Sequence, residues 1–531
     1  MTESTLAAPP ISKTLSLIVL VATSLILYSQ SFRNDFVWDS ADAICQDASI
    51  RDIRNIPNFF TQFYHASINP EGNVLKSIPY YRPLLKTYRT LQYMVFGQNP
   101  VGYNTMNITW NALVVVLAFQ LIHAMTGMIN VAFLASLLYA VNPTRVEAVS
   151  WVISDCYILV AFLALAALLS YHQGKYLMAL ALYSATLFIH EQSIQFAAVI
   201  VIYELTMREK LGLKNLLQAA PFVGVTTLYL GTRLLFSGAL PPTASPLPAP
   251  FSMAVVVLKR YLKIFFSPDA LITVYEKQSF PFTSGELILS LALLVTLFFV
   301  AVWLFRKRSH LALFWYAWFF IWISLPIAST MTNRLGEFLM ADKGIYLSSL
   351  GLCFLVAWSV VSAPEWSKKI VYVGLAALIL FHSTYTFART KYWKSETVYF
   401  EKAYEFVPNF YMITDILGRL YAKQNKYDEA QRFFERTIAL DPRNSLAYSD
   451  LGNVLYLKGD TLGAKQAWEK AARADDANPI PYYNLGMLHE NDGDIAGAAA
   501  MYRRYLALAK DVPNEVRTHI ATLEAMNGSP K

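Results

Sequence analysis

Eleven apolar runs fill much of the first 390 residues, and several approach the roughly 20 residues that a helix needs to cross a bilayer core. With 55% hydrophobic and only 15% charged residues, the chain is too apolar to be a soluble globule. Some runs are short, so tilted, re-entrant or fused segments remain alternatives. We therefore expect about eleven spans, covering residues 14–31, 105–124, 129–141, 155–171, 175–190, 192–206, 215–236, 284–305, 311–330, 345–361 and 370–388.

Short basic loops set the expected orientation. The first run, Thr14 to Gln30, is followed by no small-residue cleavage site and is expected to be a retained signal anchor. With a cytoplasmic N-terminus, four basic loops lie inside, as the positive-inside rule favours. They carry Lys175, Arg208 with Lys210 and Lys214, Arg306 to Arg308, and Lys368 with Lys369. Because the basic residues lie in such loops, the net charge of +7 does not predict a nucleic-acid partner.

The same orientation places two long loops, 32–104 and 237–283, on the periplasmic or lumenal face, together with acids at the ends of spans. Ionised groups at an apolar boundary are costly and usually functional, so we expect a shared site there. The alternative is that acids are merely excluded from cytoplasmic loops. The acids concerned are Asp39, Asp42, Glu147, Asp155, Glu191, Glu337 and Asp342.

A 34-residue period begins near residue 408, where the composition becomes that of a soluble helical domain. It is marked by Leu417-Gly418, Leu451-Gly452 and Leu485-Gly486, by Ala430, Ala464 and Ala498, and by Phe434, Trp468 and Tyr502. This tetratricopeptide spacing predicts an α-solenoid of about three repeats, capped by a helix from Val512 onward. We expect a membrane domain over 1–390 and a repeat domain over 391–531, with a concave surface for a polypeptide.

The outer-face acids and the peptide-binding repeat together favour a transferase that uses a lipid-linked sugar. Such a reaction needs a base near the acceptor hydroxyl and cations to stabilise the departing phosphate. Asp39 is the candidate base, and Asp42 is a second candidate or a metal ligand. The candidate phosphate ligands are Lys343, Arg145 and Arg82, and the supporting residues are Glu147, His190, Glu191 and Asp342.

Each candidate has a purely structural alternative. Asp39 could cap a helix, Lys343 could neutralise Asp342, and Arg145 could pair with Glu147. Arg82 could simply fix its loop, and His190-Glu191 could form a satisfied turn. No hydrolase triad, nucleotide-binding loop or dinucleotide motif is found, so hydrolase, ATPase and redox functions are poorly supported.

The chain resembles the transmembrane-and-tetratricopeptide O-mannosyltransferases, relatives of the protein O-mannosyltransferases with the GT-C fold. The resemblance rests on segments in a fixed order: Phe36-Val-Trp-Asp39, Tyr81-Arg-Pro-Leu84, Pro143, Glu147-Ala-Val149, His190-Glu191-Gln192, Ala341 to Gly351, Arg389 and Trp393. It implies a GT-C glycosyltransferase that uses a dolichyl- or undecaprenyl-phosphate sugar, with Asp39 at the catalytic acidic position.

Four positions depart from the family pattern. Asn142 replaces a histidine before proline, Asp155 replaces an arginine, His190 replaces a lysine, and Lys343 replaces an arginine. The loss of cationic positions leaves two alternatives: a donor seated differently, or a changed substrate or lost activity.

These observations lead to one expected function and one rival. The expected function is inverting transfer of a hexose such as mannose from a polyprenyl-phosphate donor to an acceptor held by the repeats. A divalent metal requirement is left open. The rival is a non-enzymatic membrane scaffold or assembly factor whose repeats are the working part. The membrane is either a bacterial inner membrane or the endoplasmic reticulum.

Overall fold

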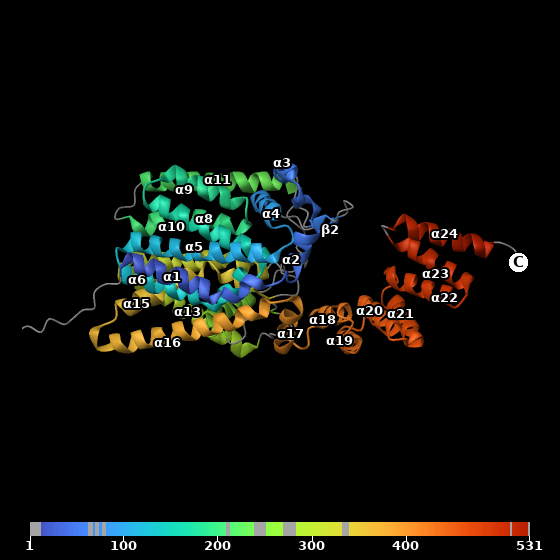
Figure 1. Cartoon of the computed structure of the whole chain (residues 1–531). Coiled ribbons are helices and arrows are strands. Elements are labelled where there is room, and N and C mark those ends of the chain that lie inside the picture. The colour runs from blue at the N-terminus through green and yellow to red at the C-terminus, as the bar shows by residue number, and fades with distance from the viewer. Residues whose placement is uncertain are drawn as a thin grey trace, which may run out of the picture. The chain divides into compact units, whose positions relative to one another are not determined.

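The computed structural model describes residues 12–61, 67–68, 74–76, 81–208, 213–237, 251–268, 275, 283–331, 339–509 and 512–528. Glu337, the proline-rich segment 241–250 and parts of both long loops lie outside these residues. The chain divides into two compact units, Met1–Glu396 and Thr397–Lys531, which follow one another along the coloured ribbon of Figure 1.

The first unit is a bundle of apolar helices. A helix occupies most of each of the eleven ranges expected to span the membrane, because each range is predominantly apolar and lies between polar or glycine-containing turns. These helices are α1 (Lys13–Leu27), α5 (Pro100–Thr126), α6 (Ile129–Val141), α8 (Asp155–His172), α9 (Tyr176–Leu187), α10 (Phe196–Met207), α11 (Leu213–Ser237), α13 (Ser284–Arg306), α14 (His310–Met331), α15 (Ser349–Val361) and α16 (Glu365–Thr390).

Within the described residues, five helices are long and apolar enough to cross a membrane: α5, α8, α13, α14 and α16. Four further apolar helices, α1, α6, α9 and α15, are shorter. Helix α5 contacts α1, α6 and α8, so it forms the centre of the bundle. Another helix, α12 (Phe251–Phe266), packs against α13 and α14.

The connection between α1 and α5 gathers at one end of the bundle, where Figure 1 shows α2, α3, α4 and β2 together. It contains η1 (Ser29–Arg33), α2 (Asp39–Ala41), η2 (Asp42–Gln46), η3 (Ala48–Arg51), η4 (Ile53–Asn55), α3 (Ile56–Thr61), the antiparallel strands β1 (Ser67–Ile68) and β2 (Val74–Lys76), and α4 (Pro83–Phe96). Pro83 occupies the first turn of α4, where a missing N–H costs nothing.

Short helices shape the other connections that bear predicted site residues. They are η5 (Pro143–Arg145), α7 (Val146–Ser150), η6 (Val152–Ser154), η7 (Glu191–Gln195), η8 (Asp342–Ile345) and η9 (Lys391–Trp393). Among the described residues, the two-stranded ribbon β1–β2 is the only strand structure, so the expected all-α class is confirmed.

The second unit consists of paired helices. After α17 (Glu396–Phe406) come α18 (Tyr411–Lys423) with α19 (Tyr427–Leu440), α20 (Ser445–Leu457) with α21 (Thr461–Ala474), and α22 (Ile480–Asn491) with α23 (Ile495–Leu508). Helix α24 (Asn514–Gly528) follows and packs against α23. The last helix buries Ile520 and Leu523 against Ala498 and Tyr502, as a capping helix does.

The 34-residue period has a direct packing cause. A side-chain carbon added to Gly418 or Gly486 would lie 2.7 Å from the ring of Phe434 or Tyr502, so only glycine admits the aromatic residue of the paired helix. The turn between paired helices requires a left-handed backbone, and φ is +88° at Gly459 and +79° at Gly493. The tetratricopeptide α-solenoid is thereby confirmed.

Candidate active site at the loop end of the bundle

Asp39 lies in a loop that α5 holds in place. Asn104 of α5 donates a hydrogen bond of 2.8 Å to the carbonyl oxygen of Asn34, and Phe36 packs edge-on against Tyr103 at 5.6 Å between ring centroids. The loop then turns sharply, because Trp38 has φ of +55° and ψ of −133°. Asp39 begins α2 and is half-buried, whereas Asp42 is exposed.

A row of side chains runs from this loop across the end of the bundle. The ring of Trp38 stacks on Trp151 at 5.5 Å, and the ammonium of Lys343 lies 3.9 Å from the centroid of Trp151. The same ammonium is 5.8 Å from the ring of Tyr157, which in turn is 4.8 Å from the ring of His190. Five residues from four separate chain segments thus meet in one continuous row.

Glu191 and Arg82 continue the row. Arg82 donates two hydrogen bonds to the Glu191 carboxylate, of 2.9 and 2.8 Å, which is the bidentate geometry of a strong ion pair. Both side chains keep some exposure, 15% and 24%. Burial alone would raise the pKa of Glu191, but Arg82 outweighs this effect and holds the pKa well below its ordinary value.

Lys343 is held by Glu147 and not by its neighbour Asp342. The backbone N–H of Lys343 donates to a Glu147 oxygen at 3.0 Å, and its ammonium is 3.4 Å from the other oxygen. Glu147 is fully buried, whereas 20% of the Lys343 side chain is exposed. The structural alternative that Lys343 neutralises Asp342 is therefore replaced by a pairing with Glu147.

Asp342 has its own buried partners. Arg389 contacts one carboxylate oxygen at 2.5 Å, and the hydroxyl of Tyr275 donates to the other at 2.6 Å. Burial raises the pKa of Asp342, Arg389 opposes that rise, and the carboxylate of Glu147 adds to it. Because the Asp342 side chain has no exposed surface, it can support the row but cannot meet a substrate directly.

Arg145 is directed into the core. Its guanidinium donates to the Tyr139 carbonyl oxygen at 2.9 Å and to the Tyr346 hydroxyl at 2.8 Å, and it also bonds the Asn111 side chain. Arg145 is fully buried, and the guanidinium carbon lies 3.7 Å from the ring centroid of Tyr139. Its predicted contact with a phosphate gains no support from this geometry, and the alternative pairing with Glu147 is not what these contacts show.

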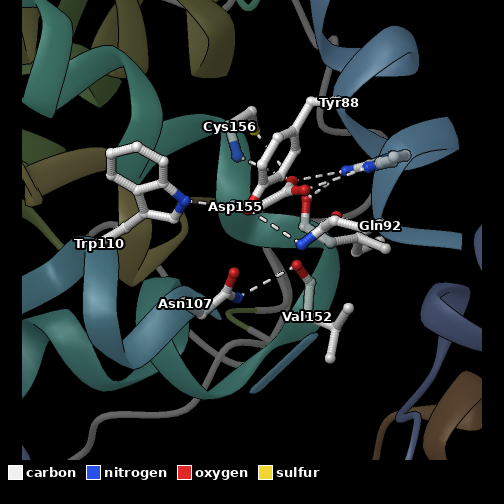
Figure 2. A network of polar contacts seen from close by, with 9 residues as sticks. Tyr88, Gln92, Asn107, Trp110, Val152, Asp155 and Cys156 are labelled. Carbon is white, nitrogen blue, oxygen red and sulfur yellow. Dashed lines mark hydrogen bonds and ion pairs between the residues drawn. The ribbon is translucent and has the colours of Figure 1, made fainter. Parts of the chain in front are cut away.

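Asp155 lies at the centre of a second network of polar contacts. Figure 2 shows it beside Tyr88, with Trp110 on one side and Gln92 on the other. Trp110 and Gln92 both donate to the Tyr88 hydroxyl, at 3.1 and 2.9 Å. The backbone N–H of Cys156 donates to Asp155 at 2.8 Å.

Helix α4 and its N-cap residue supply three of the cations at this end of the bundle. Arg89 pairs with Asp155 at 2.7 Å, and Lys86 pairs with Asp47 at 3.5 Å. Together with Arg82 at the start of the helix, these cations are spaced four and three residues apart, which places them on one helical face. Arg89, which the sequence reasoning missed, is thus the buried partner of Asp155.

The sequence reasoning also missed Trp151, Tyr157 and Arg233. The charge of Arg233 in α11 acts on the imidazole of His190 together with those of Arg82 and Lys343. Arg233 lies one turn after Tyr229, whose ring packs edge-on against Phe188 at 5.9 Å. A charged residue near the end of an apolar helix was the available signal for Arg233.

No group of three or more histidine, cysteine, aspartate or glutamate side chains is arranged to hold a metal ion, as far as the described ranges extend. Asp42 as a metal ligand therefore stays a prediction. The fold and these contacts define a class: a membrane protein with a polar site at one end of a helical bundle and a tetratricopeptide domain.

The comparisons specify that class further. The tetratricopeptide repeat family matches residues 417–479 and 459–513. The human protein O-mannosyl-transferase TMTC3 is 24% identical over 497 residues, covering 83% of this chain and 53% of its own length. The human protein O-mannosyl-transferase TMTC1 is also 24% identical, covering 82% of this chain and 56% of its own length. The chain matches this TMTC-like family, and the resemblance expected from the motifs is confirmed.

The chain spans about half the length of the curated relatives it matches. Among solved structures, the Archaeoglobus fulgidus oligosaccharyltransferase aligns with 71% of this chain and 55% of its own, with a TM-score of 0.40 and 12% identity.

Proposed function

We propose that this chain is a membrane glycosyltransferase that transfers a hexose such as mannose from a polyprenyl-phosphate donor to a polypeptide acceptor. The observation that carries the proposal is the continuous row from the Asp39 loop through Trp151 and Lys343 to Arg82. It brings a half-buried carboxylate and two partly exposed cations to one end of an apolar bundle. The names of the relatives support the same class of reaction.

The roles follow from what the transfer requires. Asp39 accepts the proton of the acceptor hydroxyl as that oxygen attacks the anomeric carbon. The bond from that carbon to the phosphate oxygen breaks, and the phosphate leaves on the opposite side, so the configuration inverts. Lys343 and Arg82 stabilise the negative charge of the departing polyprenyl phosphate.

The cations of the proposed phosphate site keep their carboxylate partners. Glu147 and Glu191 fix Lys343 and Arg82 in place, which reduces the conformational entropy lost when a phosphate binds. His190 supplies no charge, because burial and the nearby Arg82 lower its pKa to about 3. A phosphate would therefore be bound by Lys343 and Arg82, with Arg233 adding to the local positive potential.

The repeats would hold the acceptor. A paired-helix stack presents an extended surface, and linking it to the membrane unit raises the local concentration of a bound polypeptide near the site. The proposed orientation has the N-terminus in the cytoplasm, with the site and the repeats on the periplasmic or lumenal face.

The test is sugar transfer by the purified full chain from a panel of polyprenyl-phosphate sugars. We expect transfer by the wild type and a loss of at least about 100-fold in Asp39→Asn, because general base catalysis contributes 10²–10⁴-fold. Asp52→Asn is the matched control, since Asp52 lies in the same segment and pairs at the surface with Arg54. Addition of a chelator separately tests the metal requirement.

Two outcomes would contradict the proposal. Undiminished transfer by Asp39→Asn would remove Asp39 as the base. The absence of transfer from every donor, while the repeats still bind a polypeptide, would favour the membrane scaffold or assembly factor.

A further inference from the structure

The backbone immediately before Asp39 is strained. Trp38 has φ of +55° and ψ of −133°, a region that glycine enters freely and that is an outlier for a bulky side chain. Such a conformation costs about 1–3 kcal/mol and persists only where the surrounding structure holds it. The strain lies one residue from the proposed base, so whatever holds Trp38 also fixes the direction of Asp39.

Trp151 makes the contacts that hold this turn. Its indole N–H donates to the carbonyl oxygen of Val37 at 3.1 Å, and its ring stacks on Trp38 with an interplanar angle of 13°. Trp393 stacks on Trp151 in turn, at 5.7 Å and 25°. Trp151 is 5% exposed and Trp393 is 1% exposed, so the stack is fixed by packing.

Trp151 also contacts the other half of the proposed site. The ammonium of Lys343 lies 3.9 Å from its ring centroid, close enough for a cation–π interaction. The indole of Trp151 therefore makes two contacts. Its N–H bonds the backbone of the loop that carries Asp39, and its ring contacts Lys343, which is a proposed phosphate ligand.

We infer that Trp151 is a positioning residue that sets Asp39 relative to Lys343. The inference rests on the proposed function for its kinetic consequence. Its structural part, the fixing of the strained turn by Trp151, does not depend on any activity.

The first test compares Trp151→Phe with Trp318→Phe. Phenylalanine keeps an aromatic ring but removes the N–H, and Trp318 is a matched control because it is 1% exposed and donates to the Leu347 carbonyl oxygen at 2.9 Å. Both variants lose one buried hydrogen bond of the same kind. We expect only Trp151→Phe to lower kcat, by about 10-fold, the change that corresponds to one lost hydrogen bond. The donor KM should change little, because Lys343 keeps a ring beneath it.

A second variant tests the strain itself. Glycine adopts φ of +55° without strain, so Trp38→Gly should make the turn less dependent on Trp151. We expect Trp151→Phe to lower kcat less in the Trp38→Gly background than in the wild type. An equal loss in both backgrounds, or equal kcat losses in Trp151→Phe and Trp318→Phe, would overturn the inference.

Amide hydrogen exchange separates this inference from the proposed function. The N–H of Ser40 is bonded to the Val37 carbonyl oxygen at 3.2 Å, and that of Ala41 to the Trp38 carbonyl oxygen at 3.3 Å. We expect exchange at these two amides to rise about 10-fold in Trp151→Phe and to remain unchanged in Trp318→Phe. If the wild type transfers no sugar, the proposed function fails, but this exchange result still decides whether Trp151 holds the turn.

Discussion

His190 lies among charged side chains, but its own imidazole is neutral. Its Nδ1 accepts a hydrogen bond of 3.1 Å from the backbone N–H of Gln192, which requires the neutral ring. Burial is the main cause that lowers its pKa, and the charges of Arg82 and Lys343 act in the same direction while Glu191 opposes them, with a resulting pKa of about 3. His190 therefore caps η7 without adding charge to the site.

This lowered pKa predicts a pH dependence of stability. Between about pH 6.5 and pH 3 the unfolded chain binds a proton at His190 that the folded chain does not bind, so stability falls as the pH falls. At pH 5 the effect amounts to about 2 kcal/mol at most. We expect thermal unfolding midpoints to fall less between pH 7 and pH 5 in His190→Gln than in the wild type. His310→Gln, at an exposed position, is the control, and equal slopes in all three proteins would contradict the assignment.

Helix α4 shows how one element can organise charges from distant segments. Arg82, Lys86 and Arg89 contact Glu191, Asp47 and Asp155, which lie on η7, before η3 and at the start of α8. The cations could be placed on one face from their spacing alone. Their partners could not be predicted, because Arg82 and Glu191 are 109 residues apart and Arg89 and Asp155 are 66 apart.

The buried pair Arg89–Asp155 predicts a large stability effect. Arg89→Met should destabilise the first unit by about 3–5 kcal/mol, because it leaves a buried carboxylate unpaired. The double variant Arg89→Met, Asp155→Asn should recover part of that loss, which a double-mutant cycle in detergent would measure. Arg54→Met, at the surface pair with Asp52, is the control. Additive losses in the cycle would show that the pair is not coupled.

The apolar runs indicated where the helices of the first unit lie, but local chemistry set the residues at which they begin. Helix α10 begins at Phe196 and not at 192, because His190 caps the short helix η7 before it. Helix α16 begins at Glu365, five residues before the expected span, since its first turns carry the charged Lys368 and Lys369. The site was harder to predict, because the row from Trp38 to Arg82 depends on contacts between segments that the sequence does not place together.

At the scale of the whole molecule, the division into two units predicts that a substitution that destabilises one unit leaves the other folded. An added side-chain carbon at Gly452 would collide with the indole of Trp468, so Gly452→Ala should destabilise the repeats by about 1–3 kcal/mol. We expect faster amide exchange in α20 and α21 and weaker binding of a polypeptide, with exchange in α5 and α8 unchanged. Gly374→Ala is the control, because nothing lies within 4 Å of the added atom. Equal changes in both units would contradict this independence.

The last segment of the first unit, which contains Trp393 and Lys394, is held to the rest of that unit by two contacts. The backbone N–H of Asp35 donates to the carbonyl oxygen of Lys394 at 3.0 Å, and Trp393 stacks on Trp151. A pulling force applied along the chain from the repeats would therefore load this hydrogen bond and this stack before it reached any long helix. Tension transmitted along the chain would therefore reach the loop that carries Asp39 through the hydrogen bond between Asp35 and Lys394.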